Sequence, residues 1–138
     1  MTELRQLTAL DAQFLAIETD RNYGHVGGLD ILDPSTAPGG ELTIDDLKKL
    51  ILDRLHLIDP FTQRLVQVPF SIDWPYWARD EHFDIVYHFR EIALPEPGRH
   101  EQLLEQVGRI YSRRLDRSRP LWEIYLIHGL EGGRVALL

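Results

Sequence analysis

Two neighbouring stretches near the end of the sequence carry apolar side chains at almost every position. In an extended conformation, residues 121–128 place largely apolar side chains on both faces of the strand. This pattern is typical of a strand in the middle of a sheet. Pro120 fixes its own φ and disfavours helix in Arg119, so the chain should enter this strand in an extended conformation. Residues 129–133 contain three glycines and predict a tight turn. Residues 134–138 then form a second apolar strand that pairs back as a hairpin.

Three other stretches repeat their apolar positions every three to four residues, which indicates amphipathic helices. The first begins after Thr8, where Asp11 occupies the position that completes a capping box, and it runs to Glu18. We expect this helix to pack against the rest of the domain through one apolar face. The residues of that face are Leu7, Leu10, Phe14 and Ile17.

The second helix is expected to begin after Thr43 and to end before Pro60, and the third follows a turn at residues 94–98 and extends to Leu115. Basic residues crowd the end of the third helix. They are Arg109, Arg113, Arg114, Arg117 and Arg119. Cations complement the helix dipole at this end, so a structural role for these arginines would suffice. Two more specific roles stay open. One is a phosphate-binding site, since arginine suits phosphate geometry, and the other is a buried brace between Asp116 and Arg117 or Arg119.

Further strands are expected at residues 25–32, 64–68 and 85–89, where apolar side chains are bounded by turn-forming residues. The aromatic stretch at residues 74–77 contains a proline, so it should form the edge of a sheet or a loop. A Pro/Gly/Ser-rich loop is expected between the first of these strands and the second helix, over residues 33–40. Strands and helices that alternate in this way predict an α/β fold.

Gly27 and Gly28 interrupt the first of these strands. A glycine inside a strand costs stability unless the structure requires that no side chain be present. We therefore expect a bulge or a close approach of another group to the backbone at this point.

The composition narrows the functions that these elements can serve. At 138 residues, with 43% hydrophobic and 27% charged residues, the chain has the size and composition of one folded domain with a buried core. A net charge of −7 argues against nonspecific binding of nucleic acid, and the lack of cysteine excludes disulfides and thiolate sites. We find neither a secretory signal nor a run of about 18–20 apolar residues. The expected compartment is the cytoplasm, and any contact with a membrane should be peripheral.

The histidines give no metal site. His88 lies within a strongly apolar run, where a lone histidine is more typical of a hydrogen-bonded structural residue than of a catalyst. His56 and Asp59 would supply two ligands, which is too few to hold a metal ion. The residues by themselves therefore predict an α/β domain without a metal centre.

The tripeptide Pro120-Leu121-Trp122, followed by the expected hairpin, resembles a motif of the bacterial wax ester synthase/diacylglycerol acyltransferase family. Other blocks agree with the family pattern in the same order: Leu7, Leu10-Asp11-Ala12, Phe14, Glu18, His25-Val26-Gly27-Gly28-Leu29, Gln63-Arg64-Leu65, Trp77, Phe83-Asp84 and His88-Phe89-Arg90. The resemblance implies the fold of coenzyme A-dependent, chloramphenicol acetyltransferase-like acyltransferases, with a mixed sheet and flanking helices.

The activity that this resemblance implies is transfer of a long-chain acyl group from acyl-CoA to the hydroxyl of a diacylglycerol or a long-chain alcohol. In the family, the strand corresponding to residues 134–138 leads into a His-His-x-x-x-Asp-Gly motif, whose second histidine is taken as the general base. Residues 1–138 do not contain that motif. The resemblance thus implies an N-terminal acyltransferase subdomain, without a catalytic residue of its own and inactive until a C-terminal part of the protein supplies the motif.

The resemblance also implies roles for residues that are present. Gly27 and Gly28 would leave room for an acyl chain in a substrate channel. Pro120, Leu121 and Trp122 would support the strand that leads to the histidine motif, with Trp122 buried in the core. We expect no cofactor, because acyl-CoA is a substrate, and the arginine cluster would be the place to hold its phosphates. The inner membrane or lipid droplets are the surfaces that such an enzyme would contact peripherally.

Two alternatives to this reading stay open. A non-catalytic acyltransferase-like binding or scaffold module would share the fold without the reaction, and a condensation-type domain fragment would act on carrier-bound substrates. An unpaired strand edge at Leu138 would disfavour a stand-alone module. Tryptophan at position 122 disfavours a condensation domain, which seldom has that residue after proline and leucine.

Overall fold

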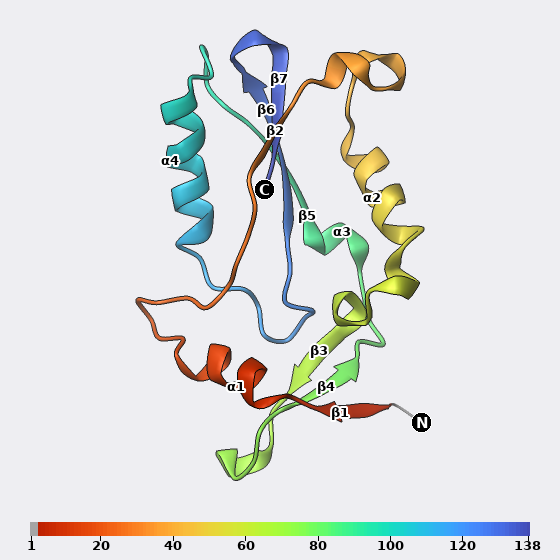
Figure 1. Ribbon diagram of the computed structural model, residues 1–138, viewed down its shortest axis with the longest axis vertical. Coiled ribbons are helices and arrows are strands. Elements are labelled where there is room, and N and C mark those ends of the chain that lie inside the picture. Colours follow the sequence, from red (N-terminus) through yellow and green to blue (C-terminus); the bar gives the residue numbers. More distant parts are fainter. Residues whose placement is uncertain (1–2) are drawn as a thin grey trace. The chain divides into compact units, whose positions relative to one another are not determined.

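A computed structural model describes residues 3–138, and these residues form two compact units. The three-strand unit contains the described residues up to Val26, together with Arg54–Phe83 and Arg114–Trp122. The four-strand unit contains Gly27–Asp53, Asp84–Arg113 and Glu123–Leu138. Figure 1 labels the helices and strands of both units.

The four-strand unit is built on a mixed sheet with the strand order β2-β7-β6-β5. Its strands are β2 (Asp30–Leu32), β5 (Phe89–Ala93), β6 (Ile124–Leu130) and β7 (Arg134–Leu137). β6 and β7 form the expected antiparallel hairpin, whereas β5 and β6 run parallel because α4 (His100–Tyr111) connects them. The mixed sheet predicted for this chain is therefore confirmed.

Helices α4 and α2 (Ile44–Leu52) lie on either side of this sheet (Figure 1). The core cluster of the unit joins α4 to β6 and β7. Its buried members are Leu94, Leu103, Tyr125, Ile127, Leu130 and Ala136. Leu126 points to the opposite face of β6 and is also fully buried, so both faces of this strand are covered. The prediction that it is a central strand is confirmed.

The three-strand unit has an antiparallel sheet with the order β1-β4-β3. Its strands are β1 (Leu4–Gln6), β3 (Gln63–Val66) and β4 (Tyr76–Arg79). The aromatic stretch was expected at an edge or in a loop. Part of it instead forms β4, the middle strand, because β1 pairs with one side of β4 and β3 with the other. Short 3-10 turns occur in both units, at Pro34–Thr36, Pro38–Gly40, Leu55–Leu57, Asp59–Thr62, Pro69–Ser71 and Glu131–Gly133.

Both predicted threonine caps are correct, but the helices that follow are shorter than expected. Thr43 closes a capping box with Asp46, and α2 then ends at Leu52, where the chain continues in 3-10 turns instead of a helix as far as Pro60. α4 likewise ends at Tyr111, four residues before the predicted end.

The predicted strand at residues 85–89 is wrong. The side chain of Asp84 accepts a hydrogen bond from the backbone N–H of Val86 and caps a single helical turn, α3 (Ile85–His88). The strand begins only at Phe89. The strand predicted at residues 25–32 is also shorter, since only its last three residues pair, as β2.

Helix α1 (Ala9–Ala16) departs from the sequence prediction in its packing. Its capping box is present, with Thr8 accepting from the N–H of Asp11 at 3.1 Å and Asp11 accepting from the N–H of Thr8 at 3.2 Å. Leu7, the residue before the cap, is buried, and its N–H donates to the carbonyl of Pro75 at 3.0 Å. The helix itself buries none of its residues, so its apolar face does not pack as predicted.

Strand β7 has partners on both sides, β2 and β6. Leu138 continues this pairing, because its N–H donates to the carbonyl of Tyr125 at 3.0 Å and its carbonyl accepts from the N–H of Tyr125 at 2.8 Å. Within the described residues, β7 therefore does not have the unpaired edge that was expected. The argument from that edge against a stand-alone module no longer applies.

Candidate functional site

The Pro120-Leu121-Trp122 motif precedes β6 instead of forming its first residues, as the sequence pattern had suggested. Pro120 is buried, and Leu121 and Trp122 are half-buried. The indole N–H of Trp122 donates to the carbonyl of Phe61 at 2.9 Å, and the two rings stack with their centroids 4.5 Å apart. Trp122 is thus a fixed packing residue of the three-strand unit, although not a fully buried one.

A tight turn lies just before this motif. The carboxylate of Asp116 accepts from the hydroxyl of Ser118 at 2.7 Å and from its backbone N–H at 2.9 Å. These two hydrogen bonds, with a smaller contribution from the charge of Arg119, hold the pKa of Asp116 below its ordinary value. Arg119 lies 3.8 Å from the carboxylate and both side chains are exposed, so the buried brace predicted here is a surface ion pair.

The lowered pKa predicts a pH-dependent effect of Asp116→Asn on stability. Because the folded-state pKa lies below the unfolded value, the stabilisation is present above the unfolded pKa and is lost as the pH falls through the folded-state pKa. We expect the variant to unfold at less urea than the parent at pH 7, and the difference to vanish in acid. Ser118→Ala, which removes the strongest hydrogen bond, should reduce the same pH dependence. A difference that stays constant from pH 7 into acid would contradict this assignment.

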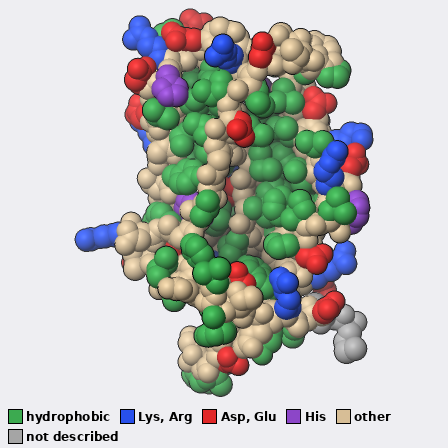
Figure 2. All heavy atoms as spheres, viewed as in Figure 1, with side chains coloured by type: hydrophobic (Ala, Val, Ile, Leu, Met, Phe, Trp, Pro, Cys, Tyr) green, Lys and Arg blue, Asp and Glu red, His purple; other side chains and the backbone are tan. Residues whose placement is uncertain are grey.

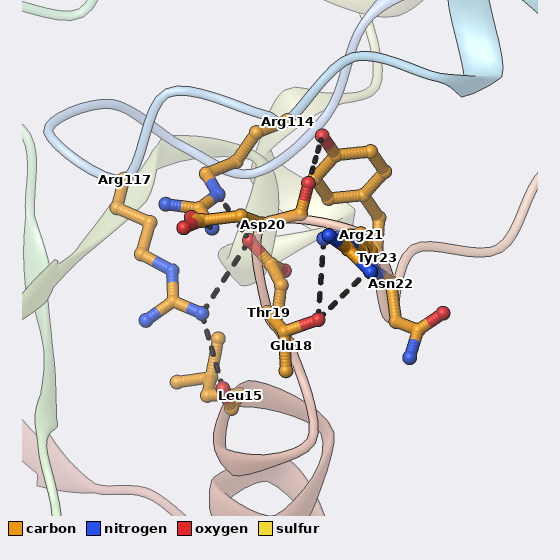
Figure 3. Close-up of polar contacts among 9 residues, drawn as sticks. All are labelled: Leu15, Glu18, Thr19, Asp20, Arg21, Asn22, Tyr23, Arg114 and Arg117. Carbon is orange, nitrogen blue, oxygen red and sulfur yellow. Dashed lines mark hydrogen bonds and ion pairs between the residues drawn. The ribbon is translucent and has the colours of Figure 1, made fainter.

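Glu18 is the centre of a polar cluster in the same unit (Figure 3). Its carboxylate Oε1 lies 3.0 Å from Nε of Arg114 and 3.6 Å from a terminal nitrogen of Arg117. Arg114 also reaches Asp20 at 3.2 Å, and Arg117 donates to the carbonyl of Leu15 at 3.1 Å. These contacts bring together residues that are about one hundred positions apart in the sequence, and no sequence pattern had paired them.

Most of the arginines considered as a phosphate site are engaged in ion pairs. Arg109 pairs with Glu105 on the surface of α4 at 2.6 Å, and Arg114 and Arg117 share Glu18. The carboxylates that accompany these guanidinium groups offset their charge, which weakens any attraction for a phosphate. The structural role of the arginine cluster is therefore the reading that these contacts favour.

Gly27 and Gly28 lie in the four-strand unit, just before β2. A Cβ atom added to Gly27 would overlap the hydroxyl of Tyr111, the last residue of α4. The close approach predicted at these glycines is thus confirmed for Gly27, and a tyrosine side chain makes it. Gly28 has open space around it, with no heavy atom of a described residue within 4 Å of an added Cβ.

This difference predicts that Gly27→Ala and Gly28→Ala have unequal effects on stability. The first substitution forces the far end of the Tyr111 side chain to move, which should cost about 1–2 kcal/mol. Gly28→Ala should change the free energy of unfolding by less than about 0.5 kcal/mol. Urea denaturation of the two variants measures the difference, and equal losses would show that Tyr111 does not constrain Gly27.

Two of the histidines contact side chains of neighbouring residues. His88 is buried, and its ring meets the ring of Tyr87 edge-on, with the ring centroids 5.2 Å apart. His128 on β6 pairs with Glu91 on β5 at the surface of the sheet. Within residues 3–138 we find no group of three or more side chains that could hold a metal ion. The same residues contain no helix that is both long enough and apolar enough to cross a membrane.

Comparison with known proteins shows the class of protein to which this chain belongs. Residues 7–138 match the wax ester synthase/diacylglycerol acyltransferase catalytic domain. The chain is similar to tgs3 of Mycobacterium tuberculosis, named a probable diacylglycerol O-acyltransferase, with 42% identity over 96% of this chain and 48% of that protein. A similar protein of Mycobacterium bovis, Mb3154c, shares 39% identity over 98% of this chain and 28% of its own length.

Solved structures show the same relationship. A wax ester synthase/diacylglycerol acyltransferase from Marinobacter aquaeolei VT8 superposes with a TM-score of 0.74 at 38% identity, over 96% of this chain and 31% of that one. The tallysomycin biosynthesis protein TlmII superposes with a TM-score of 0.63 at 18% identity, over 98% of this chain and 30% of that one, which shows the fold alone. The chain belongs to the wax ester synthase/diacylglycerol acyltransferase family. It spans half or less of the length of the relatives that it matches.

The expected acyltransferase fold and the resemblance are thereby confirmed. The roles predicted for Gly27, Gly28, Pro120, Leu121 and Trp122 toward substrate stay predictions. Sequence reasoning missed the Glu18 cluster as a unit, although Glu18 and the two arginines had each been singled out. An acidic residue just after a helix that has no basic residue in its last turn is the signal that would have suggested it.

Proposed function

We propose that this chain is the N-terminal part of an acyl-CoA:diacylglycerol O-acyltransferase/wax ester synthase. The observation that carries the proposal is the agreement along the whole chain: the family match over residues 7–138 coincides with a superposition of 96% of the chain on the Marinobacter enzyme. Family and fold thus support the same reaction class, and the superposition extends well beyond the Pro-Leu-Trp motif.

The proposed reaction is transfer of an acyl group to a hydroxyl. A general base takes the proton of the acceptor hydroxyl, the oxygen bonds to the carbonyl carbon of the thioester, the carbon–sulfur bond breaks, and the departing thiolate of coenzyme A takes the proton back from the base. Such a base contributes typically about 10²–10⁴-fold to the rate. We place the base in a C-terminal part of the protein, and residues 1–138 act as an N-terminal subdomain that needs this part for activity. No cofactor beyond the acyl-CoA substrate enters this scheme.

Residues of this chain support the reaction indirectly in this proposal. Pro120 and Trp122 fix the chain just before β6, the strand whose hairpin partner β7 would lead to the histidine motif. Gly28, with open space around it, borders the path of the acyl chain. Gly28→Val should then shift the preferred acyl-chain length before it affects folding. An unchanged preference in a folded, active variant would remove Gly28 from the channel.

A lipid surface is the second partner that we propose. The connection between β3 and β4 exposes Phe70, Ile72 and Trp74 by 96%, 79% and 48%. In the part of Figure 2 where Figure 1 places this connection, the tip of the three-strand unit, hydrophobic side chains lie beside an acidic one. Asp73 is the one charged residue in the sequence from Gln67 to Trp74, and aromatic residues favour the membrane interface. Diacylglycerols and long-chain alcohols reside in such surfaces, so an enzyme that consumes them gains by docking there.

The docking proposal predicts weaker binding to lipid when the tip becomes polar. Phe70→Ser/Ile72→Ser should lower the affinity of the full-length gene product for phosphatidylethanolamine/phosphatidylglycerol vesicles at least about tenfold. Leu57→Ser is the control, because Leu57 is a similarly exposed residue elsewhere in the same unit. Co-sedimentation measures both. Equal binding by the parent and the double variant would exclude the tip as the docking element.

The reaction itself is tested with labelled acyl-CoA and either diacylglycerol or a long-chain alcohol. We expect ester formation by the full-length gene product and none by residues 1–138 alone. Turnover by the 138-residue chain would contradict the need for a C-terminal base. Substrate binding without turnover by the full-length product would favour the non-catalytic module instead, and transfer only from carrier-bound acyl groups would favour a condensation-type domain.

A further inference from the structure

Helix α1 has little in its own sequence to hold its C-terminal end. It has eight residues, fewer than an isolated helix needs for stability in water, and it buries none of them. Thr8 and Asp11 satisfy its N-terminus. At the other end the last turn contains no basic residue, and the cap residue is Ile17 in a right-handed conformation. The C-terminal carbonyls of α1 therefore take their partners from water or from elsewhere in the chain.

Arg117 supplies one of these partners. Its guanidinium donates to the carbonyl of Leu15, which belongs to the last turn of α1 and has no partner within the helix. The positive charge also complements the negative end of the helix dipole. The same terminal nitrogen lies 3.6 Å from Oε1 of Glu18, so one side chain binds both the helix end and the residue that follows it (Figure 3).

Glu18 holds the two arginines together. Its side chain is only 11% exposed, and a carboxylate in such a place is costly unless opposite charges accompany it. Arg114 and Arg117 provide those charges. Among the described residues no aligned hydrogen bond reaches Oε1, so its contacts with the arginines are electrostatic and depend on the charge of Glu18.

The segment that Glu18 holds leads directly to the Pro-Leu-Trp motif. Arg114 and Arg117 fix its beginning, the turn formed by Asp116 and Ser118 shapes its middle, and Trp122 fixes its end on Phe61. Only two residues separate Arg117 from Pro120. We expect a change at the beginning of so short a segment to reach the motif, because only Ser118 and Arg119 lie between Arg117 and Pro120.

We propose that Glu18 is a positioning residue for acyl transfer. It acts through Arg114 and Arg117 to keep the segment Arg114–Trp122 in the one conformation from which the chain enters β6. This inference rests on the proposed function, in which that segment supports the strand leading to the catalytic histidine. Glu18 itself touches no substrate in this scheme. Its contribution is preorganisation, which lowers the conformational cost of assembling the reacting groups.

The experiment compares Glu18→Gln with Glu105→Gln in the full-length gene product. The two substitutions make the same chemical change, but Glu105 pairs with Arg109 on the exposed surface of α4. For Glu18→Gln we expect amide hydrogen exchange to become about tenfold faster over residues 112–122, while β6 and β7 keep their protection. We also expect kcat to fall about tenfold with KM for acyl-CoA within twofold of the parent. Glu105→Gln should change neither quantity.

Arg117→Lys provides a second test if Glu18→Gln folds poorly. Lysine keeps the charge but lacks the forked guanidinium that reaches both Glu18 and the carbonyl of Leu15, so both effects should be intermediate. Exchange over residues 112–122 that is unchanged in Glu18→Gln would overturn the proposal. So would a loss of kcat that Glu105→Gln reproduces. If the parent protein transfers no acyl group, the proposed function fails, whereas the exchange experiment still decides whether Glu18 positions the segment.

Discussion

Gly98→Ala should be among the most destabilising single substitutions in this chain. Gly98 has φ of +73°, a left-handed conformation that costs an L-residue about 1–2 kcal/mol. A Cβ at this position would also overlap the backbone carbonyl of Gly129, at the end of β6, and backbone cannot swing aside as a side chain can. The N–H of Glu131 donates to the carbonyl of Gly98 at 3.0 Å, so moving the loop also breaks this bond. We expect a loss of roughly 3–5 kcal/mol, a large part of the stability of an ordinary domain.

Gly132→Ala is the matched control for this prediction. Gly132 has nearly the same φ, +75°, but no heavy atom of a described residue lies within 4 Å of an added Cβ. Its substitution should cost only about 1 kcal/mol, because conformational strain remains and overlap does not. Urea denaturation of both variants separates the two contributions. Similar losses at the two glycines would mean that the contact between Gly98 and Gly129 does not limit the structure.

Trp122→Ala should be the second large effect. The substitution removes a ring stacked on Phe61 and the hydrogen bond to the carbonyl of Phe61, and it leaves a cavity before β6. Since Trp122 is half-buried, we expect a loss of about 3 kcal/mol, at the low end for replacing a large aromatic residue by alanine. Acyl transfer by the full-length gene product should fall in proportion to the fraction that remains folded.

Trp122→Phe separates the contributions of the ring and the hydrogen bond. Phenylalanine can keep the stacking on Phe61 but cannot donate a hydrogen bond, so a loss of about 1 kcal/mol is expected. Denaturant titration combined with the acyl transfer assay measures both variants. If Trp122→Ala unfolds at the same urea concentration as the parent and yet loses turnover, Trp122 contacts substrate directly.

Local patterns predicted the elements whose partners are close in sequence. The β6–β7 hairpin and the caps at Thr8 and Thr43 were all predicted correctly, because each depends on a few adjacent residues. The apolar run at residues 85–89 was misread, since the side chain of Asp84 turns its first part into a helix. β4 lies in the middle of its sheet because β1 pairs with it across a separation of seventy or more residues, a pairing that a local pattern cannot reveal.

The same limit applies to the candidate site. The glycine pair predicted a close approach to the backbone, but nothing near Gly27 in the sequence indicated that Tyr111 makes it. Glu18 and Arg117 each had a plausible local role, and only the folded chain shows that they share an ion pair. The function proposed for this chain came from the resemblance to the acyltransferase family, because the elements that would support catalysis look like ordinary structure in the sequence.

The pairing of β2 with β7 also has a consequence for synthesis on the ribosome. β2 lies between residues 30 and 32, and its partner emerges about one hundred residues later. At roughly 5–20 residues per second, the nascent chain carries β2 without its partner for roughly 5–20 s. The exposed apolar residue Ile31 and the unpaired backbone around it are then available to other chains. Newly made protein should therefore depend on chaperones that hold nascent chains, even where the finished fold is stable.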